Sequence, residues 1–394
     1  MRALTYHGSR NVRVETVVDP VLQDPEDLLL RVTATAICGS DLHLYRGKMP
    51  GLRHGDILGH EFMGIVEEVG SAVKRVRPGD RVVVPFVVAC GDCHFCARSL
   101  FAACETTNSG RGALLGRKGL RPGAALFGYT QFYGGLQGGQ AEYVRVPKAN
   151  TGPLRIPELL TDTQVLFLSD ILPTGYQAVL NAELGPGSSL AIFGAGPVGL
   201  MAAACARMLK VERIFMVDQH PGRLAFAARS YGVEPLDFRQ CEDPARAIVA
   251  ATQDRGVDAC IDAVGFEAEG ACLETLLARL RLSGGSGQVL RWAIAATRRG
   301  GVVSVPGVYA AFLHAFLLGD AFEKGLQFRM GQTHVQRYMP ELLERIGRGE
   351  LQPELIVSHH MRLEDAPLAY EYFDRCPDDC RKVVLRPGPG GLLP

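Results

Sequence analysis

The sequence has no excess of charge of either sign, because its 42 Lys and Arg residues balance 42 Asp and Glu residues. Nucleic acids and anionic membranes attract proteins with a basic surface, so this balance argues against both kinds of partner. Long hydrophobic runs are also missing. The longest apolar stretch, residues 190–206, is interrupted by three glycines and a proline and is too short and too broken to span a membrane.

A secretory signal is not visible either. The first residues contain one Arg, but they have neither the apolar segment nor the cleavage site that such a signal requires. We therefore expect a cytoplasmic protein. In a reducing compartment, eleven cysteines predict metal binding rather than a framework of disulfides.

The composition is that of an ordinary folded protein, with 47% hydrophobic and 21% charged residues in 394. That length predicts two or three domains. Up to about residue 157, short apolar runs alternate with turn residues, which indicates a β-rich domain. Further on, strand, glycine-rich turn and helix alternate, as in a doubly wound parallel sheet. We predict an α/β protein in which residues 158–335 form the parallel-sheet domain, and residues 1–157 and 336–394 form the β-rich domain.

The run GAGPVG at residues 194–199 has the G-x-G-x-x-G spacing of a dinucleotide-binding turn. A predicted strand precedes it, a helix of small residues follows it, and an acidic residue ends the next strand, as the fingerprint requires. The first glycine permits the tight turn, the second admits the pyrophosphate, and the third lets the helix pack on the sheet, with the helix N-terminus facing the phosphates. The predicted cofactor residues here are Gly194, Gly196, Pro197, Val198 and Gly199.

The acidic residue is Asp218, 19 residues after Gly199. Its carboxylate is expected to accept a hydrogen bond from the adenosine ribose and to repel a 2′-phosphate, which favours NAD over NADP. Arg223 lies close enough in sequence to relax that preference and is included among the cofactor residues.

A compact cluster of cysteines predicts a structural zinc site. Four thiols lie within 15 residues, in a lobe of about residues 88–106. A closed tetrahedral zinc needs four such soft ligands, and it leaves no position open for catalysis. The cluster consists of Cys90, Cys93, Cys96 and Cys104. His94 lies inside the loop and could replace one cysteine, but the four thiols already complete the count.

Other ligand-type residues are scattered, and spacing alone cannot join them. In combination, however, the motifs resemble the zinc-dependent medium-chain alcohol dehydrogenase superfamily over nearly the whole chain and in the same order. The motifs are Cys38-Gly39-Ser40 with His43, Gly59-His60-Glu61, the four-cysteine loop and the glycine-rich turn. Residues 167–176 (FLSDILPTGY) and 331–338 (GQTHVQRY) are similar to the branch of glutathione-independent formaldehyde dehydrogenase and formaldehyde dismutase.

The resemblance implies a GroES-like fold for the β-rich domain and a Rossmann fold for the other. It also implies a catalytic zinc held by Cys38, His60 and Asp170, where Asp170 stands at the position at which ordinary alcohol dehydrogenases carry a cysteine. Three protein ligands leave a fourth position for water or the substrate oxygen.

Further roles follow from the same resemblance. Ser40 would take the alcohol proton and pass it through the cofactor ribose to His43. Glu61 would tune the metal or bind it transiently. Gly39, Thr174 and Val264 would touch the cofactor.

We therefore expect an NAD-dependent enzyme with two zinc ions per chain that interconverts a primary alcohol or short aldehyde with its oxidised partner, and the resemblance implies a dimer or tetramer. Three alternatives stay open: a polyol or secondary alcohol dehydrogenase, a formaldehyde dismutase with tightly held NAD, and a zinc- and nucleotide-binding protein without catalysis. Glu269 and Ala271 depart from the pattern of branch members that retain their cofactor, which disfavours dismutation. The presence of Ser40 and His43 disfavours the non-catalytic reading.

Overall fold

The computed structural model describes residues 1–108, 123–265, 287–309 and 316–388. Glu269 and Ala271 lie outside the described residues. The chain divides into two compact units: unit 1 combines Met1–Pro173 with His334–Pro394, and unit 2 is Thr174–Thr333. No helix among the described residues combines the length and the hydrophobicity that crossing a bilayer would need.

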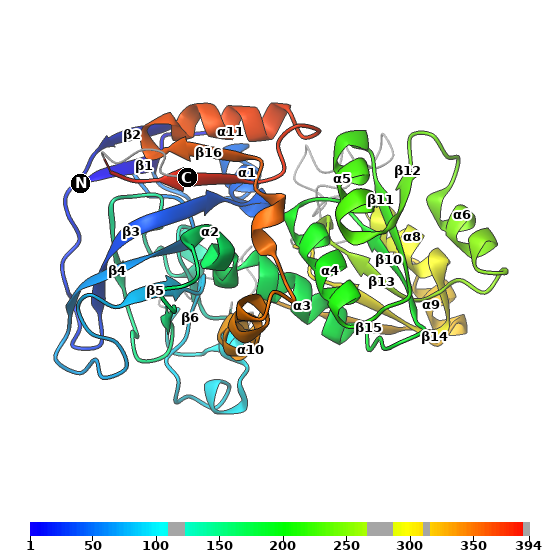
Figure 1. Ribbon diagram of the computed structural model, residues 1–394, viewed down its shortest axis with the longest axis horizontal. Helices are drawn as coiled ribbons and strands as arrows, with labels where there is room; N and C mark the ends of the chain where they lie inside the picture. Colours follow the sequence, from blue (N-terminus) through cyan, green and yellow to red (C-terminus); the bar gives the residue numbers. More distant parts are fainter. Residues whose placement is uncertain (109–122, 266–286, 310–315, 389–394) are drawn as a thin grey trace. The chain divides into compact units, whose positions relative to one another are not determined.

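Unit 1 is built on a seven-stranded sheet that is antiparallel except where its last two strands pair with each other (Figure 1). Along the sheet, the strand order is β16 (His359–Arg362), β17 (Val383–Arg386), β3 (Leu28–Ile37), β4 (Glu61–Val69), β5 (Arg81–Val84) and β9 (Leu154–Arg155), with β8 (Tyr143–Val146) also paired to β3. Two small hairpin-like sheets join β1 (Arg2–Tyr6) with β2 (Val12–Thr16), and β6 (Val87–Val88) with β7 (Ala125–Leu126).

Side chains along β3 point alternately to the two faces of the sheet, and those on one face form part of the core of unit 1. Leu28, Leu30 and Val32 point to one buried face, where they pack with Phe62 and Phe127. The two phenyl rings meet edge to face with centroids 5.1 Å apart. The sheet therefore presents one apolar face to the interior, and the ends of β3 and β4 are held in fixed positions.

The helices of unit 1 range from 4 to 13 residues in length. They are α1 (Gly39–Tyr45), α2 (Asp162–Val165), α10 (Val335–Gly347) and α11 (Ala366–Arg375), the last of which packs on β16 and β17 (Figure 1). Single 3-10 turns occur at η1 (Cys96–Arg98), η2 (Phe101–Ala103), η4 (Gln131–Tyr133), η5 (Leu166–Ser169), η7 (Pro353–Ile356) and η8 (Leu363–Asp365).

Unit 2 contains a six-stranded, fully parallel sheet. The order is β12 (Glu234–Asp237), β11 (Arg213–Asp218), β10 (Ser189–Phe193), β13 (Val257–Asp262), β14 (Thr297–Val305) and β15 (Gln327–Met330). Counted from the first strand of the unit, this is 3-2-1-4-5-6, the Rossmann order. The α/β class and the doubly wound parallel sheet predicted from the sequence are confirmed.

Helices cover both faces of the parallel sheet (Figure 1). The helices α4 (Pro197–Met208) and α5 (Pro221–Tyr231) pack together on one face, and α6 (Pro244–Ala251) and α8 (Gln288–Ala296) on the other; α3 (Ile171–Asn181) and α9 (Leu318–Glu323) complete the set. A proline opens α4, α5 and α6, where the missing N–H costs nothing.

The division between the units falls after Pro173 and after Thr333, whereas the sequence placed it at residues 157 and 335. From the sequence, residues 158–170 are predicted to begin the parallel-sheet domain. In the structure, α2 and η5 pack against β3, β4 and β5, so they belong to unit 1.

Candidate metal centres and dinucleotide turn

Three scattered ligand candidates meet at one end of the unit 1 sheet. Cys38 follows directly after β3, and His60 directly precedes β4. Because these strands are paired, with Ala36 opposite Glu61, the two side chains become neighbours. Asp170 arrives from the end of η5, which packs on β4.

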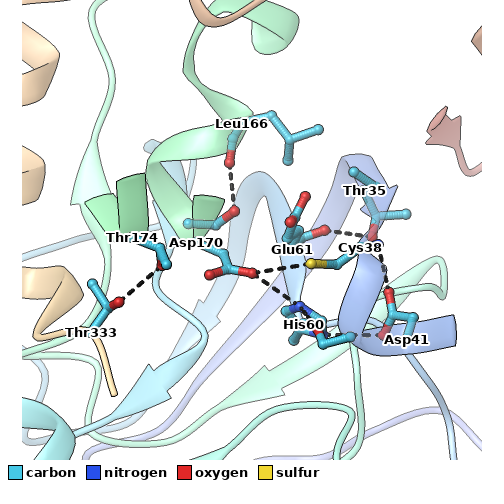
Figure 2. Close-up of polar contacts among 12 residues, drawn as sticks. Thr35, Cys38, Asp41, His60, Glu61, Leu166, Asp170, Thr174 and Thr333 are labelled. Atoms are coloured by element: carbon cyan, nitrogen blue, oxygen red, sulfur yellow. Dashed lines mark hydrogen bonds and ion pairs between the residues drawn. The ribbon is translucent and has the colours of Figure 1, made fainter. Parts of the chain in front are cut away.

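The ligand atoms of this group lie close together and are buried. Oδ2 of Asp170 is 3.1 Å from Nε2 of His60 and 3.5 Å from Sγ of Cys38. One ligand atom from each of Cys38, His60, Glu61 and Asp170 fits within 4.8 Å of all the others. Figure 2 shows the carboxylate of Asp170 directed at both the thiol and the imidazole. The structure thus brings together all three predicted ligands of the catalytic zinc, with Glu61 beside them.

The donor set suits a divalent cation. Tetrahedral zinc with nitrogen, oxygen and sulfur ligands places the donor atoms roughly 3.3–3.8 Å apart, close to the spacing in this group. Burial, together with the negative charges of Glu61 and Asp170, raises the pKa of Cys38 to about 11. A thiol in such surroundings becomes a thiolate only when a cation compensates for the negative charge.

A second carboxylate orients His60, and the sequence did not reveal it. Oδ1 of Asp41 lies 3.1 Å from Nδ1 of His60, while Oδ2 of Asp41 accepts the N–H of Cys38 at 2.9 Å. The buried amide of Gln140 lies 3.4 Å from the same Oδ2, and its Oε1 accepts the hydroxyl of Tyr370 at 2.8 Å. With Nδ1 directed at a carboxylate, Nε2 is the nitrogen left to bind a metal.

The predicted proton-relay residues lie on α1. The hydroxyl of Ser40 is 3.3 Å from Nε2 of His60, so it reaches the ligand cluster. His43 follows one turn later on the same helix, and its side chain is half-buried. A second missed residue is Lys382, which directly precedes β17, the strand next to β3, and whose Nζ donates to Glu61.

The four cysteines of the predicted structural site form a second cluster. Their sulfur atoms are separated by 3.6 Å between Cys90 and Cys104, 3.9 Å between Cys90 and Cys96, and 4.0 Å between Cys93 and Cys104. A zinc–sulfur bond of about 2.3 Å predicts sulfur atoms about 3.8 Å apart in a tetrahedron. His94 is not part of the cluster, because its Nδ1 faces the guanidinium of Arg98 at 3.1 Å.

The four thiols differ in pKa, because burial raises the pKa of Cys90 and Cys96, whereas nearby hydrogen-bond donors lower the pKa of Cys93 and Cys104. The N–H of Cys93 points to Sγ of Cys90 at 3.4 Å, and the N–H of Cys90 points to Sγ of Cys104 at the same distance. Burial alone would raise the pKa of Cys104, but hydrogen bonds from Thr106 and from the backbone lower it to about 6. Cys104 is therefore the thiol of this loop that most readily supplies a thiolate to a metal.

The glycine-rich turn in unit 2 joins β10 to α4. Gly194 has φ +100°, and a Cβ added at Gly199 would lie 1.9 Å from the carbonyl oxygen of Gly194, so only glycine fits there. Asp218 ends β11, and its Oδ2 accepts the N–H of Ala195 at 2.6 Å. Arg223 lies on α5, and a Cβ added at Gly196 would be 4.0 Å from its Nη1. The turn, the acidic residue and the arginine are thus assembled at one place.

The remaining predicted cofactor residues are divided between the units. Thr174 accepts a hydrogen bond from the hydroxyl of Thr333 at 3.0 Å within unit 2 (Figure 2). Val264 lies beside the glycine-rich turn, since a Cβ on Gly194 would come within 2.8 Å of its Cγ2. Gly39 opens α1 in unit 1.

Comparison with known proteins decides the family. An uncharacterized zinc-type alcohol dehydrogenase-like protein of Bacillus subtilis is 40% identical to this chain over 98% of the chain and all of the relative. The chain belongs to the zinc-dependent medium-chain alcohol dehydrogenase superfamily. Its residues 24–158 match the alcohol dehydrogenase GroES-like domain, and residues 197–284 match the zinc-binding dehydrogenase family. The GroES-like and Rossmann folds implied by the resemblance are therefore confirmed.

Two further similarities locate the chain within this superfamily. A glutathione-independent formaldehyde dehydrogenase of Pseudomonas aeruginosa is 36% identical over 95% of this chain and 94% of that protein. Among solved structures, the alcohol dehydrogenase TADH from Thermus sp. ATN1 is 38% identical, with a TM-score of 0.84, covering 98% of this chain and all of the other. The predicted similarity to the formaldehyde dehydrogenase branch is confirmed.

Proposed function

We propose that this alcohol dehydrogenase-type oxidoreductase uses NAD to oxidise a primary alcohol or a short hydrated aldehyde. The observation that carries the proposal is the buried cluster of Cys38, His60 and Asp170, whose donor atoms are spaced for zinc. The identity to a glutathione-independent formaldehyde dehydrogenase supports a short aldehyde as one substrate.

Zinc held by these three residues would polarise the substrate oxygen, and NAD would accept the hydride. Ser40 lies within reach of the ligand cluster and accepts the hydroxyl proton of the substrate. His43 receives that proton after Ser40 and releases it to solvent. Asp41 keeps the imidazole of His60 in the orientation that directs Nε2 to the metal.

The cofactor preference follows from unit 2. The N-terminus of α4 would face the pyrophosphate, and the carboxylate of Asp218 would bind the adenosine ribose. A carboxylate at this position repels a 2′-phosphate, so NAD is the preferred cofactor. Arg223, Thr174 and Val264 would complete the contacts.

We further propose a second, structural zinc ion on the four cysteines, a homo-oligomer of two or four chains, and a cytoplasmic location. The four-sulfur cluster supports the structural ion. The oligomer rests on resemblance to the superfamily, and the location on composition and on cysteine usage.

A substrate panel tests the proposed reaction. The purified protein is mixed with NAD and a series of primary alcohols, secondary alcohols, polyols and short aldehydes, while the appearance of NADH is followed by absorbance. We expect activity with a primary alcohol or short aldehyde, and a Ser40→Ala variant should lower kcat by roughly 100-fold or more while it retains its metal. Absence of NADH across the whole panel would exclude the dehydrogenase.

A further inference from the structure

Asp262, at the carboxyl end of β13, is a completely buried carboxylate that accepts hydrogen bonds from neutral groups. Its Oδ1 accepts the N–H groups of Val264 and Gly265, both at 3.0 Å. Its Oδ2 accepts the phenol hydroxyl of Tyr309 at 2.6 Å. Its main-chain oxygen accepts the N–H of Gly307 at 3.0 Å. One residue thus ties the turn after β13 to the turn after β14.

These two turns contact each other through the backbone. Gly265 has φ +74°, and a Cβ added there would lie 2.5 Å from the carbonyl oxygen of Val308. A Cβ added at Gly307 would lie 2.6 Å from the nitrogen of Gly265. Such a close approach leaves no room for a side chain at either glycine, so the backbones of the two turns pack directly on each other, and the hydrogen bonds of Asp262 link the same two turns.

Burial raises the pKa of Asp262, although the hydrogen bonds from Tyr309, Gly265 and Val264 oppose that shift. A buried carboxylate stabilised by neutral donors depends on every one of them, because each missing donor leaves an acceptor without compensation for its lost hydration. The phenol of Tyr309 is the donor that can be removed without altering the backbone.

The position of this pair in the sheet suggests what it serves. Ligands of Rossmann folds bind outside the carboxyl ends of the strands, where the strand order reverses, which here is between β10 and β13. The half that contains β10, β11 and β12 carries Asp218, the residue expected to bind the adenosine ribose. The half of the sheet that begins with β13 would then bind the nicotinamide nucleotide. Val264, beside Gly194, lies at the junction of the two halves.

We propose that Asp262 and Tyr309 are positioning residues that hold the two turns in place for the nicotinamide half of the dinucleotide. The inference rests on the proposed binding of NAD. Loss of the phenol hydroxyl leaves the turns free to adopt other arrangements, and the cofactor must then select the competent one, which lowers its apparent affinity. Adenine nucleotides that lack nicotinamide do not contact these two turns, so their affinity should not change.

The test compares NADH and ADP binding by isothermal titration calorimetry to the full-length, metal-loaded protein. In Tyr309→Phe, we expect NADH to bind about tenfold more weakly, while ADP stays within about twofold of the native value. Asp262→Asn, which loses one acceptor, should show a loss of NADH affinity of similar size with ADP again unchanged. Tyr231→Phe removes a phenol at the end of α5, near the opposite edge of the sheet, and should leave both affinities unchanged.

The titrations distinguish failure of the positioning role from failure of the proposed NAD binding. Unchanged NADH affinity in Tyr309→Phe would overturn the positioning role, and so would equal losses of NADH and ADP affinity, since these indicate a general defect of the unit. If the native protein binds neither ADP nor NADH, the proposed cofactor itself is wrong. Thermal unfolding of each variant verifies that it is folded at the temperature of the titration.

Discussion

The ammonium group of Lys382 lies 2.8 Å from Oε1 and 2.7 Å from Oε2 of Glu61, and both side chains are completely buried. Burial alone would lower the pKa of Lys382, but Glu61 and Cys38 raise it. The positive charge of Lys382 therefore neutralises the negative charge of Glu61. The negative charges left to balance a divalent cation are then the thiolate of Cys38 and the carboxylate of Asp170.

Replacement of Lys382 by methionine should therefore be strongly destabilising. Glu61 would remain as a buried carboxylate without its partner, and breaking a buried pair in this way costs about 3–5 kcal/mol. The free energy of unfolding, measured by denaturant titration with and without Lys382→Met, checks this value.

The double variant Glu61→Gln with Lys382→Met supplies the control, because it removes both charges. It should recover most of the lost stability. A double variant as unstable as Lys382→Met alone would show that the packing of the lysine stem, rather than its charge, stabilises this part of unit 1.

Metal content should separate the two proposed zinc sites. We expect the native protein to hold two zinc ions per chain, one for each ligand group. Asp170→Ala should lose the zinc bound with Cys38 and His60, and Cys104→Ser should lose the other, so that each variant retains one. Elemental analysis of the purified proteins provides the measurement, and full retention of both ions by either variant would contradict the corresponding site.

Asp41 should control the affinity of the catalytic site without binding the metal itself. Asp41→Asn weakens the contact that orients His60, and the loss of such an outer partner typically costs roughly 10–100-fold in metal affinity. Competition with a coloured chelator measures the affinity directly. The structural zinc serves as the internal control, because its four cysteines do not contact Asp41.

Cofactor preference should depend on the charge of Asp218. In Asp218→Asn, the repulsion of a 2′-phosphate disappears, so the ratio of kcat/KM for NAD to that for NADP should fall by about tenfold or more. Asp258→Asn is a matched control in the same unit, because Asp258 pairs with Arg298 at 2.7 Å rather than with the glycine-rich turn. An unchanged ratio in Asp218→Asn would assign cofactor discrimination to another residue.

The local motifs could be predicted from the sequence because the residues of each motif lie close together along the chain. The four cysteines lie within 15 residues, and the glycine-rich turn needs only its own strand and helix. The catalytic cluster is different. Asp170 is 132 residues from Cys38 and 110 from His60, so only a family resemblance could join them before the structure was known.

The supporting residues could not be found in this way. Lys382 is 321 residues from Glu61 and reaches it only because β17 pairs with β3, with Val383 opposite Ile37. Tyr309 is 47 residues from Asp262 and belongs to the turn after the neighbouring strand. Strand pairing decides such contacts, and a single sequence does not specify which strands become neighbours.

The strand that carries this pairing also has a consequence for synthesis. β17 lies between β16 and β3, inside the sheet of unit 1, and it is the last strand described in the chain. The ribosome therefore completes the whole of unit 2 before it delivers β17. Until then, β8 pairs with residues 28–31 of β3, but Thr35, Ala36 and Ile37 lack their partner strand, and Glu61 lacks the ammonium group of Lys382. Unit 1 can reach its final form only after translation has passed residue 386.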